Sequence, residues 1–247
     1  MNRQGPGGIS WTNYTWNPVT GCERGCPYCY ARRTYERFGR SFEPTLHEKR
    51  LVEPTKVKEP SKVFVCSVAD LFGPWVPSAW VKRVLIAADE APQHTYQYLT
   101  KCPEGLSEWA FNSNDWVGIT AVDQASAEVA LSYFASRPRT LIPVRFISAE
   151  PLIGPIDTDL TGLDWLIIGA MTGPGATAPK IEWVRRLVER AIEARVPVWM
   201  KENLAVTPRA QMWPGVYEES VWKATDTAAS CPSLTRADVI RMLGGQA

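Results

Sequence analysis

The sequence predicts an α/β fold in which short buried strands alternate with helices, as in a partial or full (β/α) barrel. Short, almost continuous apolar runs such as residues 62–67 are typical of strands buried on both faces. Segments with helical periodicity follow several of these runs, and this alternation indicates a parallel sheet with outer helices. A chain of 247 residues is also long enough for a single barrel domain.

The N-terminal part carries the first elements and a cysteine-rich turn. Residues 1–9 are rich in Gly and Pro, so we expect them to be disordered. Residues 10–20 are rich in Trp, Tyr and Thr and are predicted to be extended up to a turn at Gly21. After the cysteines, residues 30–39 are predicted to form a helix that Gly39 ends.

The remaining elements of the core, predicted to span residues 10–204, alternate regularly. Asp123 is expected to cap the second of the later helices. The predicted strands are residues 62–67, 96–100, 116–120, 144–148, 165–169 and 198–200, the predicted helices are 78–90, 125–136 and 181–194, and a short segment is expected near 105–111.

The C-terminal part, residues 205–247, departs from this alternation. Pro208, Pro214 and Pro232 interrupt it, and residues 235–243 are predicted to form a short terminal helix. We expect this short irregular extension to pack on the core, where it closes the barrel mouth or covers an edge strand.

Composition excludes several classes of protein. An apolar fraction of 45 % with 21 % charged residues is typical of a soluble globular protein. We find neither a membrane-length apolar run nor a signal-peptide pattern, so we expect no membrane partner and a cytoplasmic location, where thiols stay reduced. The net charge is only +1, but residues 1–50 hold eight Lys/Arg against four Asp/Glu. This basic excess predicts either a solvated helix face or a surface for a phosphate-bearing substrate.

Three of the six cysteines lie within eight residues, with the spacing C-x3-C-x2-C. As thiolates, Cys22, Cys26 and Cys29 can bind three of the four irons of a [4Fe–4S] cluster. The fourth iron then stays open to bind a reagent. The other cysteines, Cys66, Cys102 and Cys231, are scattered, and Cys66 is predicted to be a buried apolar residue inside a strand.

Other interpretations of the three cysteines fit less well. A structural zinc site needs four ligands, usually as two pairs, but His47 and His94 are the only histidines and are not paired in spacing. A disulfide framework suits small secreted domains. A ferredoxin-type cluster would normally show its further cysteine nearby.

The cysteine spacing resembles the signature of the radical S-adenosylmethionine (SAM) superfamily, in which an aromatic residue, here Tyr28, commonly precedes the last cysteine. The resemblance implies a partial (β/α)6-type radical SAM barrel. It also implies SAM on the open iron of the cluster, a reductant such as flavodoxin or ferredoxin, and cleavage to a 5′-deoxyadenosyl radical that abstracts hydrogen from a substrate.

Further segments of residues 10–205 resemble a phage-associated family of compact radical-SAM-like proteins. These segments are TWNPVTGC, CPYCYA, FVCSVADLF, YLTKCPE, ISAEPLIGPID and DWLIIGAMTGPGA. This resemblance implies an enzyme in the host cytoplasm that acts on a nucleobase or modified nucleotide in phage DNA. Isomerisation of a thymidine that carries an amino-acid substituent is one form, and photoproduct-lyase-like DNA repair is another.

Polar residues that follow the predicted strands complete the candidate site, because the loops after strands carry the chemistry of α/β barrels. Glu150 is a candidate for a ribose hydroxyl or a substrate amine, and the loop of residues 169–175 allows a cofactor to approach the backbone. We expect the cofactor to contact Tyr28, Ser67, Asp70, Lys101, Thr120, Ser148 and Glu150, and the substrate to contact Lys201, Glu202, Met171 and Thr172.

Two departures from the resembled family concern the substrate loops and not the cysteines. Met171 stands where the family usually has a carboxylate, and Glu202 stands where a Gln often follows the lysine. They indicate a specialised substrate. The alternative from another class is a non-catalytic nucleic-acid-binding module with a structural zinc site.

Overall fold

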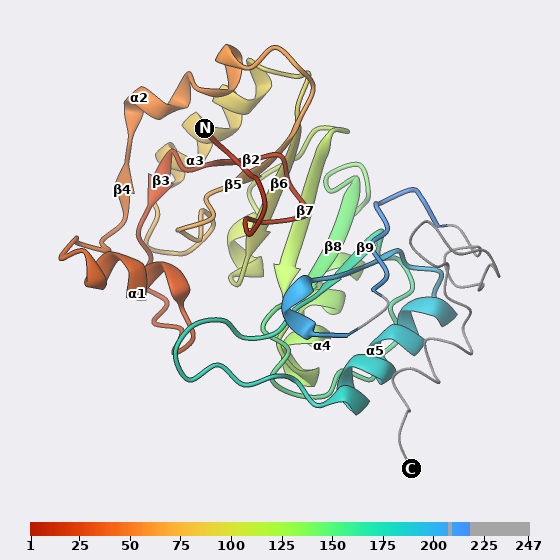
Figure 1. Ribbon diagram of the computed structural model, residues 1–247. Coiled ribbons are helices and arrows are strands. Elements are labelled where there is room, and N and C mark those ends of the chain that lie inside the picture. Colours follow the sequence, from red (N-terminus) through yellow and green to blue (C-terminus); the bar gives the residue numbers. More distant parts are fainter. Residues whose placement is uncertain (207–208, 218–247) are drawn as a thin grey trace. The chain divides into compact units, whose positions relative to one another are not determined.

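The structure is a computed structural model that describes residues 1–206 and 209–217. The chain divides into two compact units (Figure 1). The first comprises Met1–Ile119 with Arg137–Pro143, and the second comprises Thr120–Ser136 with the chain from Val144 onwards. Both contain parallel strands with helices between them, so the fold is a mixed α/β fold with mostly parallel sheet.

The first unit is built on parallel strands with one antiparallel edge strand. Its strand order is β1-β2-β5-β6-β7, in which β1 is antiparallel to β2 and the other neighbours are parallel. A separate antiparallel pair joins β3 to β4. The strand bounds are Asn2–Arg3 (β1), Tyr14–Trp16 (β2), Val19–Thr20 (β3), Thr45–Leu46 (β4), Lys62–Val65 (β5), Thr95–Thr100 (β6) and Asp115–Thr120 (β7).

The helices of this unit follow the predicted pattern where periodicity is clear. Helix α1, Tyr30–Arg37, and helix α3, Ser78–Asp89, confirm the predictions for residues 30–39 and 78–90. Helix α2, Glu48–Leu51, and the short 3-10 helix Pro54–Lys56 are not predicted from the sequence. A second 3-10 helix, Pro103–Leu106, covers part of the segment expected near 105–111. In Figure 1, α1 lies next to β3 and β4.

The N-terminal residues differ from the expectation of disorder. Asn2 and Arg3 pair with Thr15 and Tyr14, and the N-terminal ammonium lies 2.5 Å from the Glu53 carboxylate. The backbone of this Gly-rich segment therefore gains partners from the sheet edge, which composition alone does not reveal.

The second unit contains the parallel strands β8, Val144–Ala149, β9, Trp165–Ile168, and β10, Val198–Met200, in that order. Helix α4, Gln124–Ala135, and helix α5, Ile181–Glu193, precede β8 and β10, and the 3-10 helix Glu202–Leu204 follows β10. Asp123 caps α4 by accepting a hydrogen bond from the Ser126 amide (2.9 Å), which confirms the predicted cap.

The described part of the tail, residues 209–217, pairs with β10. The Met200 amide donates to the Ala210 carbonyl (2.8 Å), and the Met212 amide donates to the Val198 carbonyl (2.9 Å). The ring of Trp213 packs against Trp165 and Trp199, with centroid distances of 5.7 and 4.6 Å. The helix predicted for residues 235–243 lies outside the described residues. No helix in the described part of the chain has the length and apolarity needed to cross a membrane.

Candidate functional site

The three clustered cysteines lie on one loop of the first unit, between β3 and α1. Gly21 begins this loop with a φ of +86°, and its amide donates to the Val68 carbonyl (3.2 Å). A Cβ on Gly21 would lie 2.1 Å from the Glu43 carbonyl oxygen. Cys22 follows, and its amide donates to the Phe42 carbonyl (3.0 Å). The start of the loop is therefore fixed by close backbone contacts that only glycine allows.

The second half of the loop is a tight turn that leads directly into helix α1. The Cys29 amide donates to the Cys26 carbonyl (3.1 Å), and Tyr28 lies half-buried inside this turn. Cys29 is the N-cap of α1, and its sulfur accepts a hydrogen bond from the Arg32 amide (3.4 Å). The positive end of the helix dipole therefore lies at the Cys29 thiol, where it favours negative charge.

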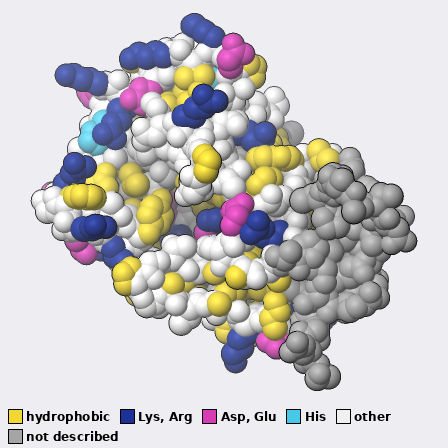
Figure 2. All heavy atoms as spheres, in the orientation of Figure 1, with side chains coloured by type: hydrophobic (Ala, Val, Ile, Leu, Met, Phe, Trp, Pro, Cys, Tyr) yellow, Lys and Arg dark blue, Asp and Glu magenta, His cyan; other side chains and the backbone are white. Residues whose placement is uncertain are grey.

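Two arginines of α1 hold the loop from the helix side. Arg32 donates from Nη2 to the Cys22 carbonyl (2.6 Å), and Arg33 donates from Nη2 to the Pro27 carbonyl (2.8 Å). In Figure 2, dark-blue Lys and Arg side chains gather over α1 at the left of the view, which agrees with the basic excess of residues 1–50. Part of that excess is thus used to fix the cysteine loop.

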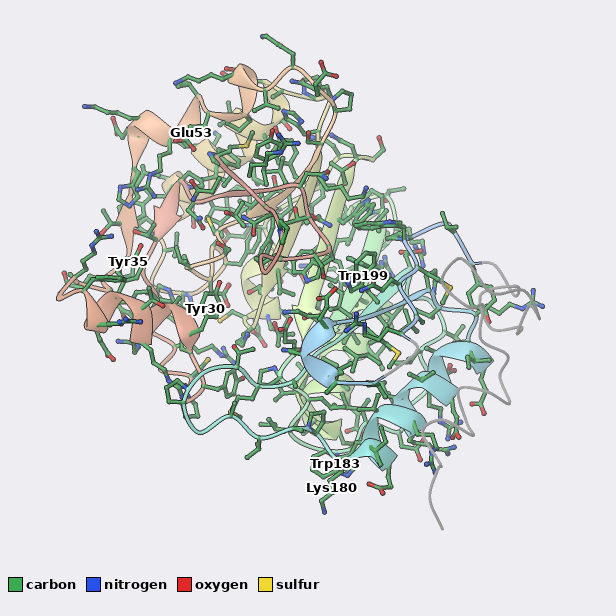
Figure 3. The ribbon with its side chains drawn as sticks, viewed as in Figure 1. Tyr30, Tyr35, Glu53, Lys180, Trp183 and Trp199 are labelled. Atoms are coloured by element: carbon green, nitrogen blue, oxygen red, sulfur yellow. The ribbon has the colours of Figure 1, made fainter. Side chains whose placement is uncertain are left out.

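The loop that follows β5 is also fixed. Tyr30, labelled on α1 in Figure 3, donates from its hydroxyl to the Ser67 carbonyl (2.5 Å). The Ser67 hydroxyl donates to Asn17 Oδ1 (3.1 Å), which also accepts from the Val68 amide (3.3 Å). Ser67, a predicted cofactor contact, therefore links helix α1, through Tyr30, to the segment between β2 and β3, through Asn17.

Asp70 is buried and is the centre of a hydrogen-bond network behind the cysteine loop. Its Oδ1 accepts from the Thr100 hydroxyl (2.6 Å) and from the Phe72 amide (3.3 Å). Its Oδ2 accepts from the Lys101 amide (2.8 Å). The structure thus brings together two residues that the sequence predicts for the site, Asp70 and Lys101, through the carboxylate of the first and the backbone of the second.

A contact that the sequence does not predict joins the cysteine loop to the end of β6. Arg24 donates from Nη1 to the Cys102 sulfur (3.1 Å), 78 residues along the chain. The Cys102 amide in turn donates to the Thr100 hydroxyl oxygen (2.9 Å). The segment of residues 100–102 therefore contacts both Asp70 and the tip of the loop.

Burial raises the pKa of three thiols in this region, those of Cys22, Cys66 and Cys102. Desolvation raises the pKa of Cys22, although hydrogen bonding from the backbone of Arg24 and Asp70 opposes it. Burial also raises the pKa of Cys102 to about 11, against the opposing effect of Arg24, and that of Cys66 to about 12. Cys66 is buried, as the sequence predicts, but β5 ends at Val65 and Cys66 lies in the turn after it with a φ of +58°, so the predicted position inside a strand is wrong.

The loop carries the donor type that iron–sulfur clusters use. Cys22, Cys26 and Cys29 are free and partly exposed, and thiolates are the ligands that such clusters use. Across the described residues, no three His, Cys, Asp or Glu side chains converge closely enough to hold one metal ion. A cluster is larger, and each of its irons takes its own thiolate, so its ligands need not converge on a point.

Other predicted site residues belong to the second unit. Thr120 and Ser148 are buried at the ends of β7 and β8. Beyond β8 and β10, Glu150 and Lys201 form an ion pair, with side chains 22 % and 18 % exposed. A Cβ on Gly169, just after β9, would lie 2.9 Å from Cδ of Glu150 and 3.0 Å from Cδ of Lys201. The pair therefore lies across the end of β9 at a position where glycine leaves room.

The remaining predicted residues lie on the surface of the second unit. Glu202 accepts a hydrogen bond from Gln211 Nε2 (3.2 Å). Met171 is half-buried and Thr172 is exposed, both in the loop after β9. Asn203 anchors the start of that loop through two hydrogen bonds with the backbone of Ala170, at 3.1 and 2.8 Å.

Sequence reasoning missed Arg24, Cys102, Asn17 and Asn203 as parts of these networks. Asn17 lies in the segment TWNPVTGC, so its position just before the cysteines was a usable signal. Arg24 and Cys102 meet only through tertiary structure, and nothing in their local sequence indicates the contact.

Comparisons with known proteins place the chain in one family. No curated protein and no solved structure matches the chain. A family described as "Protein of unknown function (DUF5131)" matches residues 7–226, which include the cysteine loop and both groups of strand ends. Because this match covers most of the sequence, the chain belongs to the DUF5131 family.

Proposed function

We propose that this chain is a radical SAM enzyme that acts on a nucleobase or a modified nucleotide in DNA. The observation that supports this most is the cysteine loop, with three free, partly exposed thiols within eight residues directly before a helix. When bound, a [4Fe–4S] cluster with SAM on its open iron supplies the reductive cleavage of SAM and the radical that abstracts a substrate hydrogen.

The residues of the loop have distinct roles in this proposal. Cys22, Cys26 and Cys29 would each hold one iron as a thiolate. Arg32 and Arg33 keep the loop carbonyls turned toward α1 through hydrogen bonds of 2.6 and 2.8 Å. The helix N-terminus favours the negative charge of the Cys29 thiolate.

The strand ends would orient the two small molecules. Asp70 acts as a positioning residue, because its carboxylate holds the backbone of residues 100–102 behind the cysteine loop. Glu150 and Lys201 suit a ligand that carries both an amine and an anionic group. In this proposal the parallel strands of the two units form the partial (β/α)6-type barrel that such enzymes use.

The basic N-terminal segment supports a nucleic-acid substrate, since phosphates bind to surfaces rich in Arg and Lys. The resemblance to a phage-associated family suggests DNA modification, for example isomerisation of an amino-acid-modified thymidine. Photoproduct-lyase-like repair is the neighbouring reaction of the same class.

Iron content of the full chain, purified and reconstituted without oxygen, tests the cluster. We expect bound iron and sulfide with an absorbance band at about 400 nm. Cys26→Ala should lose the iron, whereas Cys102→Ala, at a thiol outside the spacing, should keep it. A colourless protein that binds zinc would overturn the proposal in favour of a structural zinc module.

Release of 5′-deoxyadenosine from SAM and a strong reductant tests the chemistry. We expect release to rise with DNA or nucleotide substrates, assayed as free nucleotides, plain DNA and phage-modified DNA. Stimulation by a peptide or a small metabolite alone would refute the nucleic-acid substrate but not the cofactor.

A further inference from the structure

The C-terminal end of helix α1 exposes an aromatic ring between two guanidinium groups. Phe38 is the C-cap of α1 and is 62 % exposed. The guanidinium carbons of Arg37 and Arg40 lie 5.8 and 5.7 Å from the centroid of its ring. We call Arg37, Phe38 and Arg40 the Phe38 surface.

The backbone explains why these three side chains meet. Gly39 has a φ of +61°, which reverses the chain at the helix end, and the Arg40 amide donates back to the Tyr35 carbonyl (2.9 Å). This C-terminal motif brings Arg40 next to the ring from the far side of the turn. The ring of Phe38 is largely exposed to solvent, so it contributes little to the packing of the fold.

Among the described residues, Arg37 and Arg40 also lack the carboxylate partners that Arg83, Arg186 and Arg190 have. Arg83 pairs with Glu48 at 2.7 Å, and Arg186 and Arg190 pair with Asp157 at 2.9 and 2.6 Å. In the described part of the chain, neither Arg37 nor Arg40 forms an ion pair.

Positive charge dominates around the Phe38 surface. Residues 30–40 contain four arginines and one acidic residue, Glu36, and the nearby Glu43 is also exposed. In Figure 2, dark-blue and yellow side chains are interspersed over α1. A cationic, aromatic surface of this kind complements an anionic ligand that also has flat faces.

We propose that the Phe38 surface binds single-stranded nucleic acid. The ring of Phe38 stacks on an unpaired base, and the guanidinium groups of Arg37 and Arg40 bind the phosphates on either side of it. A base in a duplex is already stacked on its neighbours, so an exposed ring favours single strands. Arg32 and Arg33 of the same helix bind the cysteine loop, so the Phe38 surface and that loop lie at opposite ends of α1.

Binding to the Phe38 surface does not require the cluster. That the bound strand is the substrate, however, rests on the proposed function. Anisotropy of a fluorescent DNA strand of about 12 nucleotides, with the duplex of the same sequence in parallel, measures binding by the full chain. Iron content is measured on the same samples, so that the two proposals are tested separately.

We expect the wild type to bind the single strand more tightly than the duplex. Phe38→Ala should weaken single-strand binding about 10-fold, and Phe38→Trp should restore it. The double variant Arg37→Gln/Arg40→Gln should make the dependence of log affinity on log salt less steep by about 1.4, the value for two single-strand phosphates. Ile86→Ala and Arg83→Gln, exposed residues of α3 in the same unit, should leave binding unchanged.

Equal affinity of Phe38→Ala and wild type would overturn the inference, as would equal losses in the α3 controls or a preference for the duplex. A protein without iron that still binds single strands through Phe38 would support the inference and refute the proposed function. An iron-loaded protein that cleaves SAM but binds no single strand would refute the inference about the Phe38 surface and support the proposed cofactor chemistry.

Discussion

The loops that follow strands carry different groups in the two units of this protein. In the first unit, the loop after β3 carries three thiols that form no disulfide, and Asp70 holds the backbone behind them. In the second unit, the charged groups at the strand ends pair with each other, as Glu150 does with Lys201 across Gly169.

This difference concerns how strongly the polar groups of each unit are already bound within the protein. The soft thiol donors of the first unit have weak contacts within the protein, such as the 3.4 Å contact of Cys29 with the Arg32 amide. In the second unit, Glu150 and Lys201 already neutralise each other. A ligand that binds to either residue must first separate this pair, and that separation reduces the free energy gained on binding. A cofactor is therefore expected first at the cysteine loop, and substrate orientation at the charged pair.

Gly21→Ala tests how strictly the cysteine loop is fixed, and we expect the largest effect here. The new Cβ would lie 2.1 Å from the Glu43 carbonyl oxygen, and the φ of +86° is unfavourable for alanine. Strain and overlap together should lower the free energy of unfolding by about 3–5 kcal/mol, measured by urea denaturation.

Gly39→Ala is the matched control for Gly21→Ala. Gly39 also has a positive φ, +61°, but a Cβ there would meet no atom within 4 Å. Its cost should therefore be strain alone, about 1–2 kcal/mol. Equal losses in the two variants would show that the backbone contact at Gly21 does not constrain the loop.

Asp115→Asn tests a buried carboxyl at the opposite end of the first unit's strands, where β7 begins. Burial is the main cause that raises the pKa of Asp115 to about 6, with a smaller contribution from Asp89. Between about pH 4 and 6 the unfolded chain loses this proton before the folded protein does, so the free energy of unfolding falls as pH rises. The fall should reach about 3 kcal/mol and be absent in Asp115→Asn.

The free energy of unfolding of Asp115→Asn and of the wild type is measured at several pH values. The difference between the two proteins at each pH reports the contribution of the Asp115 carboxyl alone. Tyr96 and Tyr98 also lie near Asp115, but burial raises their pKa values and they stay neutral over this range. Asp89→Asn should shrink the pH-dependent difference without removing it, because burial is the larger cause. A difference that does not change with pH would contradict the raised pKa of Asp115.

Sequence predicts the helices and central strands of this fold well, because their periodicity is local. Helix α4 begins after Asp123 as expected, and α1 follows the cysteines directly. The two-residue strands β1 and β4 are too short for any periodicity, so they escape prediction.

The candidate site is predictable only in part, because only some of its features are local in the sequence. The cysteine spacing is local, and so is the strand-end position of Asp70, Glu150 and Lys201. All three form polar contacts within the protein, and their contact with a cofactor or substrate stays a prediction. The contact of Arg24 with Cys102 spans 78 residues and depends on tertiary structure, which a single sequence does not encode in any local pattern.

Asp70→Asn tests the network behind the thiols, with a smaller expected effect. The two oxygens of the Asp70 carboxylate accept from the Thr100 hydroxyl and from the Lys101 amide. The side chain of asparagine has only one oxygen, so in the variant an NH2 group replaces one of these two acceptors. Losing a hydrogen bond to a charged acceptor should cost about 2 kcal/mol in urea denaturation. Asp157→Asn, at an exposed carboxylate of the second unit, is the control and should cost less. A smaller loss at Asp70 than at Asp157 would show that the network is not what holds residues 100–102.

The smallest expected effect is the coupling between Glu150 and Lys201, measured by a double-mutant cycle with Glu150→Gln and Lys201→Met. Side chains that are 22 % and 18 % exposed should couple by about 1 kcal/mol, and by less at about 1 M salt. The more exposed Arg83–Glu48 pair should couple by about 0.3 kcal/mol.

This coupling decides whether the charged pair can open for a ligand. Separating groups coupled by about 1 kcal/mol reduces ligand affinity only about fivefold, so a substrate with an amine and an anionic group can replace both partners. A coupling of about 3 kcal/mol or more would instead identify a structural pair. The strand ends of the second unit would then hold the fold, and substrate orientation would have to come from other residues, such as those of the first unit.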